Sequence, residues 1–266
     1  MLGKRMADDQ PHGSGAHLSL AFLQATWAQG RVQAAYQPIV ALDTGMIVAE
    51  EALARWIAPD GTAWPAGAFI EAAAASGRLA GIDEAVLAQT LKRCHGRQTE
   101  HLPPRLHFVN VSTALLSSPV RLGRLAGVVA DCGTPRPTDD PRLRSLVIEV
   151  TERDLIPHLP TLTRALDPLL ASGVRLALDD FGSGYSSFLY LADLPIAFLK
   201  VERALIARAG RDKRIDAMIR SIAQLAQDLD IVTIAEGIES SDTAAAVAAL
   251  GVSWGQGYHF GRPGWE

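Results

Sequence analysis

The sequence predicts an α/β protein built as a modified TIM-type (β/α)8 barrel whose first strand runs antiparallel to its neighbours. Eight short runs of β-branched or aliphatic residues alternate with segments of helical length, which is typical of parallel βα units. Only Leu42 to Gly45 separates the first run from the second, which leaves room for a hairpin turn and not for a crossover helix. An open doubly wound sheet is the alternative architecture.

The predicted elements follow one another without a break from residue 18 onward. The strands are expected at Tyr36–Ala41, Met46–Trp56, Leu106–Ser112, Ser145–Thr151, Arg175–Asp180, Phe198–Val201, Ile231–Gly237 and Trp254–Phe260. Helices are expected where apolar residues recur three and four positions apart, at Phe69–Ala75, Asp83–Cys94, Leu159–Ser172, Asp212–Leu229 and Asp242–Leu250. We therefore expect one domain over residues 18–266. Residues 1–17 are polar, contain Gly-Ser-Gly and lack the apolar run of a signal peptide, which predicts a flexible tail.

Composition and charge narrow the class of protein. The chain has 266 residues, of which 48% are hydrophobic and 20% charged, and this composition favours a folded protein over a disordered one. A formal net charge of −4 and the lack of a basic run argue against polymeric nucleic acid as a partner. Cys94 and Cys132 have neither a metal-ligand spacing nor the density of a disulfide scaffold. Since no apolar stretch approaches the roughly 20 residues of a spanning helix, we expect a cytoplasmic protein without a membrane span.

Polar side chains recur near the carboxyl ends of the predicted strands, and a closed barrel would bring these ends together at one mouth. They are Glu51, Asn110, Glu149, Asp179, Asp180, Lys200, Glu236 and Gln256. A single acidic residue at a strand end is usually a helix cap or a solvated group. The recurrence of polar groups on strand after strand instead predicts a shared site.

The charge of this predicted site calls for bound cations. Five carboxylates in a small volume raise one another's pKa values and cannot all stay ionised without compensation. Lys200 and Arg55 supply two positive charges, and the remaining deficit of about three suits one or two divalent ions. Carboxylate and amide oxygens, without Cys or His, favour Mg²⁺ or Mn²⁺ over zinc or haem iron. Two such ions would activate a water and stabilise both oxygens of an in-line phosphoryl displacement.

Two further segments border the predicted site. Glu51, Leu53 and Arg55 alternate along a strand and therefore share one face. The guanidinium of Arg55 suits bidentate phosphate binding, and a plain ion pair with Glu51 is the alternative. The segment Asp179–Ser187 lacks the spacing of known phosphate-binding glycine motifs. We interpret it as a mobile loop beside the metals, with a simple turn as the alternative.

Several short motifs, taken together and in order, resemble the EAL family of cyclic di-GMP phosphodiesterases. They are Tyr36–Val40, Glu51–Trp56, Phe108–Ser112, Ile148–Glu152, Asp179–Ser187, Leu199–Val201, Ala235–Glu239 and Gln256–Phe260. The resemblance spans about residues 18–263. It is specific because separate motifs agree at once, whereas the tripeptide Glu-Ala-Leu alone would carry no information.

The resemblance implies an enzyme that hydrolyses one phosphodiester bond of cyclic di-GMP to linear pGpG, on a barrel with an antiparallel first strand. The metal ligands that it implies are Glu51, Asn110, Glu149, Asp179, Asp180 and Glu236, with Asp179 bridging two ions. The catalytic residues that it implies are Lys200, which would hold or help deprotonate the attacking water, and Glu51, Asp180 and Gln256. It implies substrate contacts from Gln37, Leu53 and Arg55, and support of a loop and of a homodimer by Glu152 and Glu239. Ca²⁺ is expected to bind and to inhibit.

Two positions depart from the family pattern. Glu202 stands two residues after Lys200, where active members usually carry Asp, and we expect it to reduce activity rather than abolish it. The usual acidic residue after Phe69 and Ile70 is replaced within a run of alanines at positions 73–75, which we expect to affect packing or dimer contacts. A catalytically weak or inactive receptor that binds cyclic di-GMP is therefore the main alternative to an enzyme. Metal-dependent hydrolysis of another phosphodiester is a third possibility.

Overall fold

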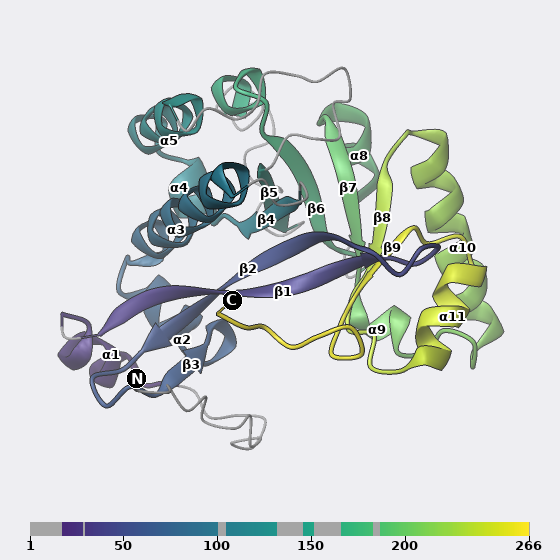
Figure 1. Cartoon of the computed structure of the whole chain (residues 1–266), viewed down its shortest axis with the longest axis horizontal. Coiled ribbons are helices and arrows are strands. Elements are labelled where there is room, and N and C mark those ends of the chain that lie inside the picture. The colour runs from purple at the N-terminus through teal and green to yellow at the C-terminus, as the bar shows by residue number, and fades with distance from the viewer. Residues whose placement is uncertain are drawn as a thin grey trace.

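Eight strands form a closed barrel with helices on its outside (Figure 1). The computed structural model describes residues 18–28, 30–100, 105–131, 146–151, 166–182 and 187–265, so the predicted tail lies outside the described residues. The barrel strands are β1 (Arg31–Ala41), β2 (Ile47–Ile57), β4 (Leu106–Asn110), β5 (Leu146–Thr151), β6 (Arg175–Phe181), β7 (Ile196–Val201), β8 (Val232–Ala235) and β9 (Trp254–Gln256).

The strand pairing confirms the modified barrel and excludes the open sheet. Around the ring the order is β1, β2, β4, β5, β6, β7, β8 and β9, and β9 returns to β1. Each neighbouring pair from β2 to β9 is parallel. Strand β1 is antiparallel to both β2 and β9. The short connection between β1 and β2 therefore dictates the one reversal in the ring.

The β1–β2 hairpin is longer than the sequence predicts. Its turn closes through a hydrogen bond from the Gly45 N–H to the Ala41 carbonyl at 2.8 Å, and the φ of +70° at Gly45 lies in the left-handed region that favours glycine. Pairing continues to Arg31 opposite Ile57. In Figure 1 this distal part of the hairpin extends beyond the barrel toward α1, α2 and β3. Strand β3 (Ala63–Pro65), which pairs with β2, is an element that the sequence analysis missed.

In Figure 1, α3, α4 and α5 lie together at the upper left and α10 and α11 lie together at the far right. The helices are α1 (Leu20–Thr26), α2 (Ala66–Ala75), α3 (Leu79–Thr99), α4 (Thr113–Leu116), α5 (Pro119–Asp131), α8 (Ser187–Asp193), α9 (Arg203–Ile206), α10 (Lys213–Asp228) and α11 (Ser241–Ala249). Side-chain caps fix the starts of three of them, because Ser19 accepts from the Phe22 N–H, Asp212 from the Arg214 N–H and Ser240 from the Thr243 N–H. Of the predicted helix at 159–172, only residues 166–172 are described, and 166–171 are helical.

Strand alternation gives the barrel interior an apolar floor. Every second residue of a strand points inward, and these residues form a buried cluster that consists of Ile39, Ala49, Leu106, Phe108, Val147, Ala177, Phe198 and Ile234. The rings of Phe108 and Phe198 meet edge to face, with their centroids 4.9 Å apart. Two residues further along the parallel strands, the same inward direction is occupied by polar side chains. A layer of polar side chains therefore lies on top of this apolar floor, at the carboxyl ends of the parallel strands.

Shortening the aromatic side chain at the centre of the floor should destabilise the whole barrel. Phe108 is 0% exposed, so Phe108→Ala leaves a cavity and should lower the free energy of unfolding by about 3–5 kcal/mol. Urea denaturation followed by tryptophan fluorescence measures this loss. Met46 is 66% exposed, and Met46→Ala should change stability by less than about 0.5 kcal/mol. Equal effects of the two substitutions would show that the floor is not the stabilising core.

Candidate active site

Lys200 is at the centre of the polar layer. Strand β7 places its side chain inside the barrel, where it is 1% exposed. The Nζ atom lies 2.7 Å from Glu236 Oε1 and 2.9 Å from Glu149 Oε1. The Glu51 and Asp179 carboxylates are slightly further away, at 3.4 Å and 3.6 Å from Nζ. One ammonium group is thus shared by carboxylates that belong to β2, β5, β6 and the residue following β8.

Amide side chains orient Glu51 from both sides. Its Oε1 atom accepts a hydrogen bond from Asn110 Nδ2 at 2.7 Å, and its Oε2 atom accepts one from Gln256 Nε2 at 2.6 Å. Gln256 Nε2 also lies 3.2 Å from Gln37 Oε1, and Gln37 Nε2 donates to the Gly261 carbonyl at 3.0 Å. Both oxygens of Glu51 are therefore fixed in direction by a chain of amides from β1, β4 and β9.

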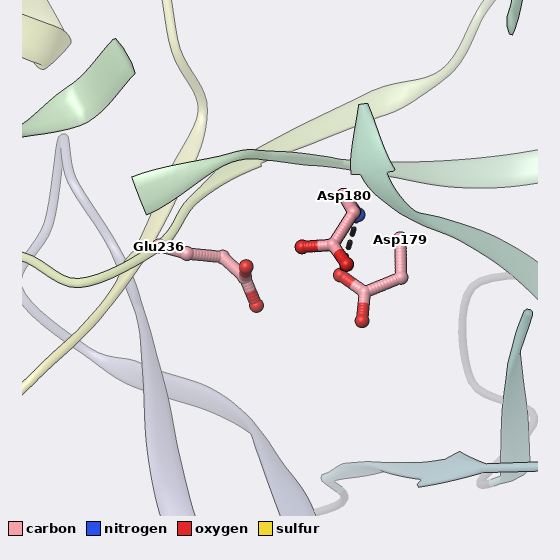
Figure 2. Close-up of side chains that lie close together, drawn as sticks. All are labelled: Asp179, Asp180 and Glu236. Carbon is pink, nitrogen blue, oxygen red and sulfur yellow. Dashed lines mark hydrogen bonds between the residues drawn. The ribbon is translucent and has the colours of Figure 1, made fainter. Parts of the chain in front are cut away.

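Asp179, Asp180 and Glu236 form an acidic cluster beside Lys200. Each offers one carboxylate oxygen, and these oxygens lie within 4.8 Å of one another. Figure 2 shows the three side chains pointing toward one another from the end of β6 and from the segment after β8. Successive residues of a regular strand would point to opposite faces. Here the φ of +57° at Asp180 and the irregular β6–β7 pairing between Leu178 and Phe181 turn the Asp180 carboxylate toward its neighbour.

A pocket of about 280 Å³ opens above this layer. Its lining consists of Gln37, Glu51, Leu53, Asp179, Lys200, Arg203, Glu236, Gly237, Glu239, Gln256, Gly257 and Tyr258. Predicted substrate contacts Gln37 and Leu53 belong to this lining. Arg55 does not, because it lies further along β2 opposite Pro65.

Glu202, which was singled out from the sequence, lies elsewhere. Glu202 follows β7 as the N-cap of α9, is half-buried and is not part of the pocket lining. Glu152 lies outside the described residues. Sequence analysis in turn missed Arg203 and Tyr258 in the pocket wall. Both had a signal, since Arg203 follows the end of β7 and Tyr258 belongs to the motif that contains Gln256.

Comparison with known proteins identifies the family. The family model described as EAL domain matches residues 21–263. The chain belongs to the EAL domain family. It is 31% identical over 235 residues to the probable cyclic di-GMP phosphodiesterase PdeG of Escherichia coli K12, over 88% of this chain and 45% of that protein. It is 32% identical over 234 residues to the cyclic di-GMP phosphodiesterase RocR of Pseudomonas aeruginosa, over 88% of this chain and 58% of that protein.

Solved EAL structures share the fold. The structure of the PaMucR phosphodiesterase in complex with c-di-GMP superposes with a TM-score of 0.80 at 28% identity, covering 92% of this chain and 97% of that one. This EAL domain corresponds to only part of its curated relatives, with PdeG, DosP and RocR matched over 45%, 30% and 58% of their lengths. Among the described residues, no helix combines the length and apolar character that crossing a membrane requires.

The polar layer of this EAL domain carries an excess of negative charge. Burial raises the pKa of Glu149 well above its usual range, and the charge of Glu51 adds to that rise. Burial likewise raises the pKa of Glu236 to about 7, although Lys200 opposes the shift. Burial alone would lower the pKa of Lys200, but Asp179 and the other surrounding carboxylates raise it well above its usual range. Lys200 therefore keeps its proton, and its one positive charge does not offset the carboxylates that surround it.

The donor set of the layer fits a divalent cation. Glu149 is 1% exposed, and neither of its carboxylate oxygens has a partner with hydrogen-bond geometry, although Lys200 lies close to one of them. Gln256 Oε1 is also buried without a hydrogen-bond partner. Together with the cluster of Asp179, Asp180 and Glu236, these atoms are hard oxygen donors of the kind that Mg²⁺, Mn²⁺ and Ca²⁺ prefer.

A second buried ionic group lies on the outer face of β2, away from the barrel interior. Glu50 points away from the barrel interior, on the opposite face of β2 from Glu51, and is 4% exposed. Its carboxylate pairs with Arg93 of α3 and lies 3.2 Å from His107 Nε2 of β4 and 3.7 Å from Arg105 Nη1. This group, which the sequence analysis did not single out, connects α3 and β4 to the strand that carries Glu51.

The Glu50–His107 contact should make stability depend on pH. Burial alone would lower the pKa of His107, but Cys94 and Glu50 outweigh burial and raise it to about 9 from 6.5. Burial alone would raise the pKa of Glu50, but His107 and Arg93 lower it to about 2, so Glu50 stays charged at neutral pH. A raised histidine pKa contributes stability that is complete below 6.5 and is lost as pH rises through about 9.

His107→Gln should therefore cost more stability at about pH 6 than at about pH 9.5, as measured by chemical denaturation at both pH values. His95 is an exposed histidine of α3, and His95→Gln provides the matched control. An equal cost of His107→Gln at the two pH values would contradict a charged His107.

Proposed function

We propose that this EAL domain hydrolyses one phosphodiester bond of cyclic di-GMP to linear pGpG in a reaction that requires Mg²⁺ or Mn²⁺. The observation that carries the proposal is the cluster of Asp179, Asp180 and Glu236 next to Lys200, at the base of an open pocket. The names of the relatives PdeG and RocR and the c-di-GMP complex of PaMucR support the choice of substrate.

In this proposal the polar layer holds two metal ions. Asp179, Asp180 and Glu236 bind them together with Glu51, Asn110 and Glu149, which complete the set of oxygen donors. When bound, the two ions supply the Lewis acidity that activates a water and stabilises both oxygens of an in-line displacement.

The remaining roles belong to side chains that orient and donate. Lys200, whose Nζ lies among four carboxylates of the layer, holds the attacking water or helps to deprotonate it. Asn110 and Gln256 fix the two oxygens of Glu51 toward the same point. Gln37 and Leu53 contact the dinucleotide from the pocket wall, and Arg55 contacts it further out along β2. Homodimer formation, with support from Glu152 and Glu239, stays a prediction.

A receptor that binds cyclic di-GMP without turning it over is the second candidate. The observation that favours it is Glu202 in place of the usual Asp after Lys200. Glu202 lies at the start of α9 and outside the pocket lining, so its extra methylene does not occupy the space above the carboxylates. The location of Glu202 outside the pocket therefore favours an enzyme over a receptor. We expect Glu202 to lower the activity of that enzyme.

Incubation with cyclic di-GMP and Mn²⁺ should yield pGpG, detected by chromatography. Asp179→Asn keeps the side-chain shape but removes its charge, and should lower kcat/KM by more than about 100-fold. Asp228→Asn, on the exposed side of α10, is the control and should match the wild type. Saturable binding without pGpG after hours would establish the receptor instead. Turnover in Ca²⁺ equal to that in Mn²⁺ would contradict the two-ion reaction.

Metal binding should be measurable without substrate. Calorimetric titration with Mn²⁺ should show binding to the wild type, and Glu236→Gln should weaken it by at least about tenfold because a carboxylate of the acidic cluster loses its charge. Asp228→Asn again serves as the control. Unchanged Mn²⁺ affinity in Glu236→Gln would show that the cluster does not hold the ion.

A further inference from the structure

We infer that Arg203 is a substrate-contacting residue, whose guanidinium leaves Glu239 to bind a phosphate of the cyclic dinucleotide at the pocket rim. The inference rests on the proposed function and adds to it the residue that recognises the negative charge of the substrate. The two cationic side chains of the pocket lining differ in exposure, because Lys200 is buried and Arg203 is exposed.

The side chains that line the pocket offer little positive charge to a ligand. Of its lining residues, Lys200 and Arg203 are the cations, whereas Glu51, Asp179, Glu236 and Glu239 are acidic. Lys200 is 1% exposed and is surrounded by carboxylates. The side chain of Arg203 is 68% exposed. A cyclic dinucleotide carries two phosphate charges, and Arg203 is the lining cation that a phosphate can reach from solvent.

The backbone beside Arg203 makes room for its side chain. Arg203 is the first residue of α9, two residues after the end of β7, and its aliphatic stem crosses Gly237. A Cβ atom at Gly237 would lie 2.3 Å from Arg203 Cγ and 2.7 Å from Arg203 Cδ, which is closer than such atoms approach. The φ of +68° at Gly237 also favours glycine. The glycine next to Glu236 thus permits an arginine stem to lie across the rim beside the acidic cluster.

The present partner of Arg203 is easily exchanged. Arg203 Nη2 lies 2.5 Å from Glu239 Oε1, and the Glu239 side chain is 60% exposed. Ion pairs that are this exposed contribute little to stability, because water competes for both groups. A phosphate offers the guanidinium the same oxygen geometry and allows two parallel hydrogen bonds. Binding of the substrate can therefore replace Glu239 without disturbing the fold.

A purely structural ion pair between α9 and the segment after β8 is the competing explanation. The two explanations differ in what they predict for Glu239. If the pair only holds these segments together, removal of either partner has the same effect on the substrate. If Arg203 contacts phosphate, removal of Glu239 frees the guanidinium, so only the loss of Arg203 weakens substrate binding.

The test compares Arg203→Met, which keeps the stem and removes the charge, with Glu239→Gln and with the double variant. Arg208→Met is the matched control, because Arg208 forms an exposed pair with Asp212 outside the pocket lining. KM and kcat come from pGpG formation in Mn²⁺, and Kd for cyclic di-GMP comes from calorimetry in Ca²⁺. Arg203→Met should raise KM and Kd about tenfold and change kcat less than about twofold. The reason is that Arg203 contributes to binding of the substrate and not to the chemical step.

Glu239→Gln should leave KM unchanged or lower it, and Arg203→Met should still raise KM in the Glu239→Gln background. Arg203→Lys, which keeps the charge without the bidentate geometry, should fall between wild type and Arg203→Met and provides the same test if Arg203→Met does not fold. Equal increases in KM for Arg203→Met and Glu239→Gln would overturn the inference in favour of a structural pair. Identical values for Arg203→Met and Arg208→Met would also overturn it.

Failure of the proposed function would look different. A wild type that neither binds nor hydrolyses cyclic di-GMP would overturn the proposed function and the inference together. A wild type that binds without hydrolysis would overturn the enzymatic proposal alone, and the Kd values of the same variants would then decide the role of Arg203.

Discussion

Negative charge is gathered at one end of the barrel, and the rest of the structure serves to hold it in place. Carboxylates from four elements surround the single buried ammonium of Lys200, and burial raises the pKa values of Glu149 and Glu236. Burying charge is unfavourable unless it is compensated, so this layer needs a rigid frame and relief of its repulsion by Lys200, by protonation or by a bound cation. The closed ring of strands supplies that frame, because each carboxylate lies on a strand with neighbours on both sides or, for Glu236, on the residue that follows such a strand.

Alternation along β2 connects the frame to the chemistry. Glu51 points into the barrel and is held by amides, while Glu50 points outward to Arg93 and His107. The apolar floor with Phe108 lies below, so the strand is fixed on its inner face, its outer face and its edges. A site that must hold several like charges at fixed positions gains from such support, since small displacements of a ligand change its affinity for an ion.

Periodicity accounts for what the sequence predicts well. Strand order, the reversed β1 and the inward positions of Glu51, Lys200 and Gln256 all follow from a two-residue repeat and a short turn. Strand β3 and helices α4 and α9 are too short to produce a periodic signal. Arg203 and Tyr258 were missed because the pocket wall is built from connections whose paths depend on tertiary contacts. Arg55 shares the face of Glu51, as expected, but lies too far along β2 to line the pocket.

The left-handed backbone at Asp180 makes the two acidic amino acids non-interchangeable there. Asp and Asn tolerate a φ of +57° better than residues with longer side chains, since their short polar groups bond locally to the backbone. Glutamate would carry the same charge but would lose this conformational tolerance and would place its carboxylate one methylene further out. In the proposed function this position is therefore constrained twice, by the carboxylate oxygen that a metal ion would need and by the backbone φ of +57°, and few substitutions would meet both demands.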